Sequence, residues 1–366
     1  MAIPYVNLAQ QHRPLRKEIL NAVASVVDSG QFILGAETEL FEKEFAAFCS
    51  AKHSVGVNSG TDALILALKC LGIGPGDEVI TAPNSYLASA SCIALAGATP
   101  KFADVREDMN LDPDAVSRAI TPRTKAIIPV HLTGKPAAMK ELMAIARQRK
   151  LEIIEDAAQA VGAELDGKPV GTFGRIGCFS LHPLKNLNAC GDGGMLVTND
   201  DKINQRTRLL RNHGQPSREE CIEFSMVSRL DSIQAAILRV KLPRLAEINA
   251  RRRTLAEHYR QRLANCAGLR CPTDGSGETS VYHTFIVQAD KRNELRTHLE
   301  SRGIGSVIHY PVPIHLMEVG RRMGHREGDF PVTERLAARI LSLPIYPELK
   351  EAQVDEVSQA ILDFYR

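Results

Sequence analysis

The chain has 366 residues, of which 44% are apolar and 24% are charged, a composition typical of a soluble globular enzyme with about two domains. Lys and Arg total 45 against 43 for Asp and Glu, and this near-balance argues against a nucleic-acid-binding protein, which usually carries a clustered basic excess. The 8 cysteines form no C-x-x-C pair and no apolar run is long enough to span a bilayer, so we expect neither a metal site nor a membrane segment.

The N-terminal segment predicts a helix and a turn, covering roughly the first thirty residues, that lead into a larger domain. Residues 1–14 lack the basic and then apolar pattern of a signal peptide. Several cysteines lie inside apolar runs, where a free thiol behaves as a small hydrophobe, so a reducing compartment fits them best. We therefore expect a cytoplasmic protein.

Short β-rich runs alternate with helical stretches between residues 55 and 198. This alternation predicts a mostly parallel sheet covered by helices on both faces. Ligands of such sheets bind beyond the carboxyl ends of the strands, so the residues that follow the strands are candidates for a site. The strand-like runs are 53–58, 77–83, 99–105, 124–132, 151–156, 177–182 and 193–199, and the helical stretches are 61–72, 85–98, 112–120 and 137–150.

The regular alternation of predicted strands and helices ends after residue 199. A long helical region runs from about 230 to 263, and Pro243 should bend it. A strand-like run at 281–290, a helix at 291–303, a strand at 305–310 and two further helices complete the chain. This order predicts two domains, a large one over residues 1–249 and a smaller α/β domain over residues 250–366.

Polar residues follow three of the predicted strands. Asp156 ends the run 151–156 directly after Glu155, Gly60 and Thr61 stand where a strand turns into a helix, and Lys185 follows the run 177–182. Each has an ordinary explanation taken alone. An acid or a hydroxyl before a helix usually caps it, and a lysine on a loop is usually solvated.

Taken together, these residues place an anion-binding helix start, a carboxylate and an amine at one edge of the sheet. This set matches pyridoxal 5′-phosphate, with the phosphate at the helix start, the aldehyde on Lys185 and the ring nitrogen on Asp156. We expect Asp156 to stay ionised, because its charge keeps the pyridine nitrogen protonated and makes the ring an electron sink.

The chain also resembles the DegT-type (DegT/DnrJ) sugar aminotransferases, which are fold-type I enzymes that use pyridoxal phosphate. The resemblance implies a large cofactor-binding domain with a mostly parallel sheet between helices and a smaller C-terminal α/β domain. It is carried along nearly the whole chain by "FILGAETELFEKEFAAF", "VNSGTDAL", "GIGPGDEVITAP", "AIIPVHLTGKP", "EDAAQAVGA", "FSLHPLKNL", "GDGG", "RLDSIQAA" and "GDFPVTERLAARILSLPIYPEL".

The resemblance implies roles for individual residues. Lys185 would bind the cofactor aldehyde covalently, and Asp156 would pair with the ring nitrogen; these two are the expected catalytic residues. The other implied cofactor contacts are Gln159 at the ring hydroxyl, Tyr86 at the start of a helix and stacked on the ring, and Gly60, Thr61 and Ser180 at the phosphate. No metal is implied.

One position departs from the family pattern. The family often has an Asn that reaches the cofactor phosphate of the neighbouring subunit, in the pattern G-x-N-x-R-[LM] before D-x-x-Q-A-A. Val227 stands at that position here, whereas Arg229 is kept. The resemblance still implies a homodimer with shared active sites, and what replaces the Asn is open. The substrate-side candidates are Arg229, His309, Tyr310 and His315.

The function implied is the transfer of an amino group from an amino acid, L-glutamate, to a nucleotide-diphosphate-linked keto sugar. The donor would leave as 2-oxoglutarate, and the product would be an amino sugar for polysaccharide or antibiotic biosynthesis. The alternatives are a cyclitol ketone as acceptor and a non-catalytic regulatory member of the fold. A sugar dehydratase on this scaffold has His in place of Lys185, and a carbon–sulfur lyase would need a reactive loop cysteine, for which Cys190 is nearest to Lys185 in sequence.

Overall fold

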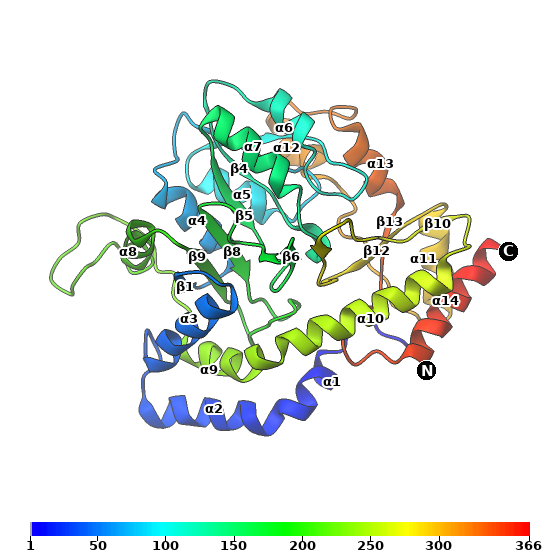
Figure 1. Cartoon of the computed structure of the whole chain (residues 1–366), viewed down its shortest axis with the longest axis horizontal. Coiled ribbons are helices and arrows are strands. Elements are labelled where there is room, and N and C mark those ends of the chain that lie inside the picture. Colours follow the sequence, from blue (N-terminus) through cyan, green and yellow to red (C-terminus); the bar gives the residue numbers. More distant parts are fainter. Residues whose placement is uncertain (1) are drawn as a thin grey trace.

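A seven-stranded sheet forms the centre of the computed structural model, which describes residues 2–366 (Figure 1). Strand β9 pairs antiparallel with β1 and β8, and all the other pairs are parallel, so the predicted mostly parallel sheet is confirmed. Every predicted strand run in this region overlaps one of its strands. In sheet order they are β1 (His53–Val57), β9 (Gly194–Thr198), β8 (Ile176–Ser180), β5 (Glu152–Asp156), β4 (Thr124–Ile128), β2 (Glu78–Thr81) and β3 (Thr99–Phe102).

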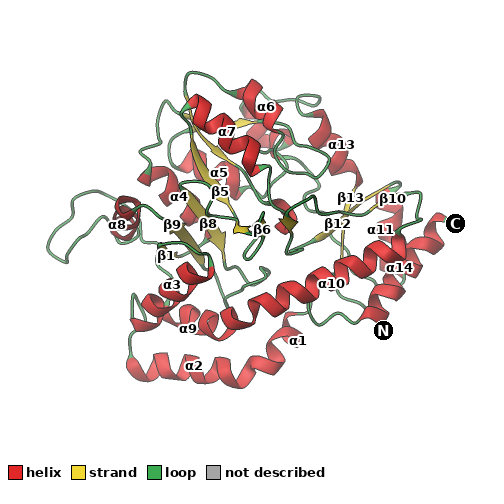
Figure 2. Cartoon of the chain, viewed as in Figure 1, coloured by secondary structure: helices red, strands yellow, loops and turns green. Residues whose placement is uncertain are grey.

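Helices cover both faces of this sheet, as Figure 2 shows. Because neighbouring residues of a strand point to opposite faces, the strands build two cores. Ile154 of β5 packs in the core with α4, α5 and α8, whereas Ile153 packs in a core on the other face with α6 and α7. A further cluster packs α3 and α9 against β8 and β9. The helices are α3 (Ala36–Phe48), α4 (Gly60–Cys70), α5 (Ala88–Leu95), α6 (Pro113–Ala119), α7 (Met139–Arg149), α8 (Asp201–Leu210) and α9 (Ser232–Lys241).

The long helical region is broken where the sequence predicts a bend. Helix α9 ends at Lys241, the short 3₁₀ helix η3 (Leu242–Arg244) contains Pro243, and α10 runs over Leu245–Leu263. Proline lacks a backbone N–H and therefore interrupts the helical hydrogen bonds. In Figure 1, α10 crosses from the central sheet to the C-terminal part of the chain, where it packs with α14.

The C-terminal part contains a three-stranded sheet in the order β10–β12–β13. Its core includes Tyr259 and Leu263 of α10 together with residues of β12 and β13. The predicted strand at 305–310 is wrong, because only Val307 forms a bridge there, to Ser342. The elements are β10 (Leu269–Arg270), β12 (Phe285–Ala289), α11 (Arg292–Ser301), η4 (Ile314–Leu316), α12 (Glu318–Arg322), α13 (Pro331–Arg339), β13 (Ile340–Leu343) and α14 (Glu351–Tyr365).

Strand β13 was not among the predicted strands. It follows α13 without a break and is only four residues long, so the periodicity of its apolar residues cannot separate it from the end of a helix. The helices after residue 310 are correspondingly more numerous than the two predicted, because the short α12 precedes α13 and α14.

The N-terminal segment contacts both parts of the molecule. Ile3 forms a parallel bridge with Ile304, and α2 packs along α9. The predicted domain boundary at residues 249–250 falls inside the uninterrupted α10, so the division into 1–249 and 250–366 stays a prediction. The remaining elements are α1 (Leu8–His12), η1 (Arg13–Leu15), α2 (Arg16–Ser29), η2 (Leu132–Gly134), β6 (Glu164–Leu165), β7 (Lys168–Pro169) and β11 (Glu278–Thr279).

None of the helices within residues 2–366 combines the length and apolar character needed to cross a bilayer. The cytoplasmic location expected from the sequence stays a prediction.

Candidate active site

The three predicted strand ends meet at one edge of the central sheet. Asp156 ends β5, Ser180 ends the neighbouring β8, and Gly194 begins β9 directly beside Ser180. Gly60 begins α4 just after β1, which pairs with β9. Lys185 lies in the loop between β8 and β9. These residues therefore line the edge at which ligands of open α/β sheets bind.

Two glycines allow the backbone segments at this edge to touch. A Cβ atom on Gly60 would lie 2.8 Å from the Cβ of Ser180, and a Cβ on Gly194 would lie 2.3 Å from the carbonyl carbon of Ser59. Side chains at these positions would push the start of α4 away from the ends of β8 and β9. The close packing holds the helix start directly above Ser180.

The start of α4 has the features of an anion-binding site. Ser59 caps the helix by accepting a hydrogen bond from the N–H of Asp62 at 3.1 Å. Thr61 is partly exposed in the first turn, and the first N–H groups of a helix have no partner inside it. The Ser180 hydroxyl, which accepts a hydrogen bond from the N–H of His182 at 3.3 Å, lies beside this turn. Backbone donors and hydroxyls therefore lie near one another here, and their predicted role at a phosphate stays a prediction.

Asp156 is a nearly buried carboxylate. Its Oδ2 accepts a hydrogen bond from the Ser89 hydroxyl at 2.8 Å, and its Oδ1 accepts one from the N–H of Ala158 at 3.2 Å. Burial raises the pKa of Asp156, while these hydrogen bonds and the charge of Lys185 oppose the rise. Within residues 2–366 no side chain forms an ion pair with Asp156. Its charge is therefore available to a protonated ring nitrogen.

Lys185 is held in a tight turn after β8. Its N–H donates to the carbonyl of His182 at 2.8 Å, and the side-chain amide of Asn188 closes the loop by donating to the carbonyl of Pro183 at 2.9 Å. Burial lowers the pKa of Lys185 from 10.5 to about 8, and the negative charge of Asp156 opposes this shift. An amine with this pKa is partly neutral near physiological pH and can attack a carbonyl group.

Buried polar residues support the Lys185 loop from behind. The Lys241 ammonium donates to the carbonyl of Asn188 at 2.7 Å and to its Oδ1 at 2.6 Å, and it lies 3.0 Å from His12 Nε2. The side-chain amide of Asn186 donates to Asn249 Oδ1 at 2.9 Å. These contacts join residues far apart in sequence, and no sequence pattern pointed to them.

Glu155 and Asp156 point to opposite faces of the sheet, as neighbours on a strand must. Glu155 is fully buried and accepts hydrogen bonds from the N–H groups of Gly171 at 2.7 Å and Gly174 at 2.6 Å. It also contacts His131 Nε2 at 3.0 Å. Because His131 Nδ1 accepts a hydrogen bond from the N–H of Ala137 at 3.0 Å, the ring proton sits on Nε2 and is donated to Glu155. Glu155 therefore holds the structure together beside the site.

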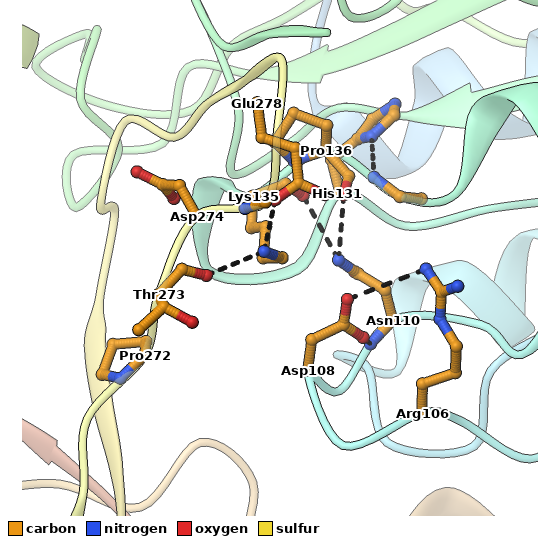
Figure 3. A network of polar contacts seen from close by, with 12 residues as sticks. Arg106, Asp108, Asn110, His131, Lys135, Pro136, Pro272, Thr273, Asp274 and Glu278 are labelled. Carbon is orange, nitrogen blue, oxygen red and sulfur yellow. Dashed lines mark hydrogen bonds and ion pairs between the residues drawn. The ribbon is translucent and has the colours of Figure 1, made fainter.

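A polar network fixes the loop that follows β4 (Figure 3). Asn110 accepts a hydrogen bond from the N–H of Leu132 at 3.1 Å and donates to the carbonyl of Pro136 at 3.2 Å. Lys135 forms an ion pair with Glu278, so the loop is also joined to the segment around β11. The loop carries Thr133 in a left-handed conformation, with φ of 64°.

This loop orients Gln159, the predicted partner of the ring hydroxyl. The N–H of Thr133 donates to Gln159 Oε1 at 2.7 Å. Tyr310 lies close to the Gln159 side chain; burial raises the pKa of Tyr310, and the interaction with Gln159 lowers it. Gln159 and Tyr310 are thus brought together at the site, although they are far apart in the sequence.

Tyr86 lies at the mouth of the site but not in a helix, which corrects the predicted helix start, because α5 begins at Ala88. Its ring is 59% exposed and lies 5.9 Å from the ring of Tyr310, at an interplanar angle of 46°. An aromatic ring with a free face can stack on a flat cofactor. The predicted role of Tyr86 is compatible with this position and stays a prediction.

The structure separates the two histidines expected on the substrate side. Burial lowers the pKa of His309 to about 4, the nearby charge of Lys185 adds to this effect, and Nδ1 lies 2.9 Å from the Ser342 hydroxyl. His315 is fully buried, contacts Glu334 at 2.9 Å and packs edge-on against Phe330. A side chain without exposed surface cannot contact a substrate in this conformation, so the geometry favours His309.

Arg229 and Val227 belong to the segment that follows the loop after α8. Arg229 donates to Asn212 Oδ1 at 3.0 Å, and Asn212 forms an antiparallel bridge with Val227, which is 43% exposed. Between them, the Ser228 hydroxyl donates to Asp62 Oδ2 at 2.8 Å. This segment is therefore tied to the first turn of α4.

Sequence reasoning missed other residues at this edge. Burial lowers the pKa of His283 far below its ordinary value, the charge of Lys185 adds to the effect, and its Nδ1 is buried without a hydrogen-bond partner in the described residues. Ser85 and Ser89 lie behind Asp156. Their four-residue spacing within the predicted helix 85–98 was the available signal, whereas nothing marked His283.

Comparisons with known proteins agree with this geometry. The model of the DegT/DnrJ/EryC1/StrS aminotransferase family matches residues 14–362. The dTDP-3-amino-3,4,6-trideoxy-alpha-D-glucose transaminase of Streptomyces venezuelae is 45% identical over 363 residues, which are 99% of this chain and 96% of that protein. The UDP-N-acetyl-3-dehydro-alpha-D-glucosamine 3-aminotransferase of Acidithiobacillus ferrooxidans is also 45% identical over 363 residues, covering 98% of this chain and 97% of that protein.

A solved structure of S. venezuelae DesV, in complex with a ketimine intermediate, is 44% identical and superposes with a TM-score of 0.98. The match covers 100% of this chain and 99% of that chain. The likeness extends over both the central sheet and the C-terminal part. This chain belongs to the DegT/DnrJ/EryC1/StrS aminotransferase family.

Proposed function

We propose that this aminotransferase moves an amino group from L-glutamate to the ketone of a sugar carried by a nucleoside diphosphate, giving an amino sugar. One observation carries the proposal: the Lys185 amine, whose pKa is lowered, and the buried Asp156 carboxylate lie at the same edge of the sheet. Pyridoxal phosphate is the cofactor, and the solved structure of a Bacillus subtilis relative, 29% identical, holds the cofactor PMP.

The residues present fit this cofactor. Because Gly60 packs closely on Ser180, the free N–H groups of α4 and the Ser180 hydroxyl would together form a cradle for a phosphate. Asp156 has no ion-pair partner within residues 2–366, so its charge can be directed at a ring nitrogen. Gln159 is oriented by the N–H of Thr133 toward the same edge.

Bound there, pyridoxal phosphate would supply an aldehyde that carries the amino group and a ring that takes up electrons. Lys185 would hold it covalently, and the Lys185 Nζ, once free, would take a proton from the substrate carbon and return it. The pKa of about 8 suits this role, because a group that transfers protons in both directions works best near ambient pH. Asp156 would keep its negative charge on the ring-nitrogen side.

The names of the relatives support a narrower substrate class. One is named for a dTDP-linked sugar with an amino group on C3, and the other for a UDP-linked sugar with a ketone on C3. We therefore propose a 3-keto nucleotide sugar as the acceptor. The reverse assay described below determines whether the nucleotide is dTDP or UDP.

A homodimer with shared sites is part of the proposal. The loop between α8 and α9 stands away from the body of the molecule in Figure 1 and carries Ile222 and Phe224, which are 61% and 97% exposed. Apolar side chains this exposed are typical of an interface. The loop leads to Val227 and Arg229, so a two-fold axis would bring this segment to the partner's site and the partner's segment to this one.

The amino donor is tested first. Wild-type protein loaded with cofactor and mixed with L-glutamate alone should lose the absorbance of the aldehyde form and release 2-oxoglutarate before any sugar is added. Lys185→Ala should show neither change. L-Cysteine in place of glutamate tests the carbon–sulfur lyase alternative, and we expect no sulfide. A spectral change that requires the sugar would contradict separate half-reactions.

The acceptor is tested in reverse. Nucleotide-linked 3-amino and 4-amino sugars, each carried by dTDP and by UDP, and aminocyclitols are incubated with 2-oxoglutarate and cofactor-loaded protein, and glutamate is measured. We expect glutamate from a 3-amino sugar. Turnover of the 4-amino sugars alone would overturn the C3 assignment, and turnover only with aminocyclitols would favour the cyclitol alternative.

A further inference from the structure

Two serines lie in line behind the Asp156 carboxylate. The Ser89 hydroxyl is 2.8 Å from Asp156 Oδ2, and the Ser85 hydroxyl is 2.9 Å from the Ser89 hydroxyl. Both serines are almost completely buried, with 4% of Ser85 and 1% of Ser89 exposed. They occupy successive turns of the segment that leads from β2 into α5.

The direction of these hydrogen bonds depends on the charge of Asp156. An ionised carboxylate can only accept, so Ser89 must donate its single proton to Oδ2. Ser89 is then an acceptor toward Ser85, and Ser85 donates. Each bond polarises the next, so the chain as a whole favours the ionised carboxylate over the protonated one. Protonation of Oδ2 would reverse both bonds.

The same segment carries Tyr86. The N–H of Ser89 donates to the carbonyl of Tyr86 at 3.2 Å, so one turn joins the aromatic ring at the site mouth to the hydroxyl behind Asp156. Other titratable groups surround the carboxylate, and burial is the main cause that raises the pKa of Asp156; of the groups that lower it, Ser89 has the largest effect. The groups that face Asp156 are Lys185 after β8, His131 after β4, Cys92 on α5, Cys178 on β8, and Tyr310 from the C-terminal part.

We propose that Ser89, supported by Ser85, is a positioning residue for the aminotransferase reaction, because it holds Asp156 Oδ2 in place and keeps the carboxylate ionised toward the ring nitrogen. This inference rests on the proposed function of Asp156. Ser89 acts through Asp156 and does not itself need to touch cofactor or substrate.

The test measures the protonation of the ring nitrogen directly. Wild type, Ser89→Ala and Ser89→Thr are loaded with ¹⁵N-labelled pyridoxal phosphate, and the ¹⁵N resonance and the pH profile of kcat are recorded. In Ser89→Ala we expect the resonance to move toward that of a neutral nitrogen. We expect the acidic limb of kcat to move to higher pH by about one unit, because a hydrogen bond to a charged group is lost. Ser89→Thr keeps a hydroxyl and should restore both.

Two further variants complete the experiment. Ser85→Ala should shift both measurements in the same direction by less, and it replaces Ser89→Ala if that variant does not fold. Ser91→Ala is the matched control, because Ser91 lies on the same helix and its hydroxyl has no hydrogen bond within residues 2–366.

An unchanged ¹⁵N resonance and an unchanged acidic limb in Ser89→Ala would overturn the inference, even if kcat falls, because the loss would then come from the packing of α5. Failure of Ser89→Thr to restore the resonance would also overturn it. The proposed function fails on a different result: wild-type protein that does not retain the cofactor, or does not react with L-glutamate, would overturn it. Failure of the Ser89 inference is seen only in the variants, so the two failures are distinguishable.

Discussion

Gly60 and Ser180 lie so close together that a Cβ atom on Gly60 would be 2.8 Å from the Cβ of Ser180 and 3.1 Å from its Cα. The second contact is with backbone, which cannot rotate away. The contact joins the start of α4 to the end of β8, two elements separated by more than a hundred residues. It places the helix start where a cofactor phosphate would bind.

Gly60→Ala should therefore separate these elements and weaken cofactor binding. Overpacking of this kind typically costs about 1–3 kcal/mol, so we expect cofactor dissociation to become roughly tenfold or more faster. Gly74→Ala is the control, because the nearest atom to its added Cβ would be 3.4 Å away. Dialysis followed by absorbance measures the loss. Equal retention by both variants would show that the Gly60–Ser180 contact is not needed for the phosphate.

Asp156→Asn and its neighbour Glu155→Gln should have different effects. Asn keeps the shape but not the charge of Asp156, so we expect kcat to fall at least ~100-fold with little change in the free energy of unfolding. Gln at position 155 cannot accept from Gly171, Gly174 and His131 together, so the free energy of unfolding should fall by about 1–3 kcal/mol. Steady-state kinetics and urea unfolding separate the two. A nearly silent Asp156→Asn would show that the charge of Asp156 is not needed and that the partner of the ring nitrogen lies elsewhere.

The pKa of Lys185 predicts how cofactor-free protein reloads with pyridoxal phosphate. Only the neutral amine attacks the aldehyde, and burial lowers the pKa from 10.5 to about 8. The rate should rise with pH and level off above about 8, after the amine has lost its proton. Reloading is followed by absorbance, with borohydride fixation of the cofactor to the Lys185 peptide as confirmation. A rate that still rises tenfold per unit above pH 9 would contradict the lowered pKa.

Lys241 should make the stability of the cofactor-free protein depend on pH. Burial lowers its pKa from 10.5 to about 8, so between these values the unfolded chain binds a proton that the folded protein has released. Stability from this group therefore rises with pH in that window and is lost as pH falls through about 8.

Lys241→Met removes this dependence. Other buried groups also titrate in the window, so the prediction concerns the difference in unfolding free energy between wild type and variant, measured in urea at pH 7.5 and 9.5. The free energy of unfolding of wild type should increase relative to that of the variant as pH rises. A difference that is the same at both pH values would show that Lys241 keeps its ordinary pKa.

Val227→Asn tests the shared site. If the partner's segment reaches the phosphate, an added amide should contribute a hydrogen bond to a charged group, typically worth about 1.5–3 kcal/mol. Cofactor loss during dialysis should then be slower than in wild type. No change would indicate that another donor already fills the position, whereas full activity of a monomer, measured by light scattering at assay concentration, would refute the shared site.

The sequence alone determined the central sheet and the positions of its chemically important residues. Strand and helix runs were readable because buried parallel strands and amphipathic helices have different periods, and ligands bind where such strands end. Asp156 and Lys185 follow strands that turned out to be direct neighbours, so their proximity needed only the correct strand runs and the rule about strand ends. The bend at Pro243 was equally local.

The tertiary structure decided what surrounds these residues. Several hydrogen bonds join segments that are distant in sequence, and no local sequence pattern predicts them. They run from Ser89 to Asp156, from Lys241 to Asn188 and from His131 to Glu155. The strand β13 was missed because a four-residue run with three apolar residues, placed directly after a helix, reads equally well as its last turn. Packing over the whole chain determines on which face of the sheet each acid lies and which residue it contacts, because burial and hydrogen bonding are set by neighbours in space.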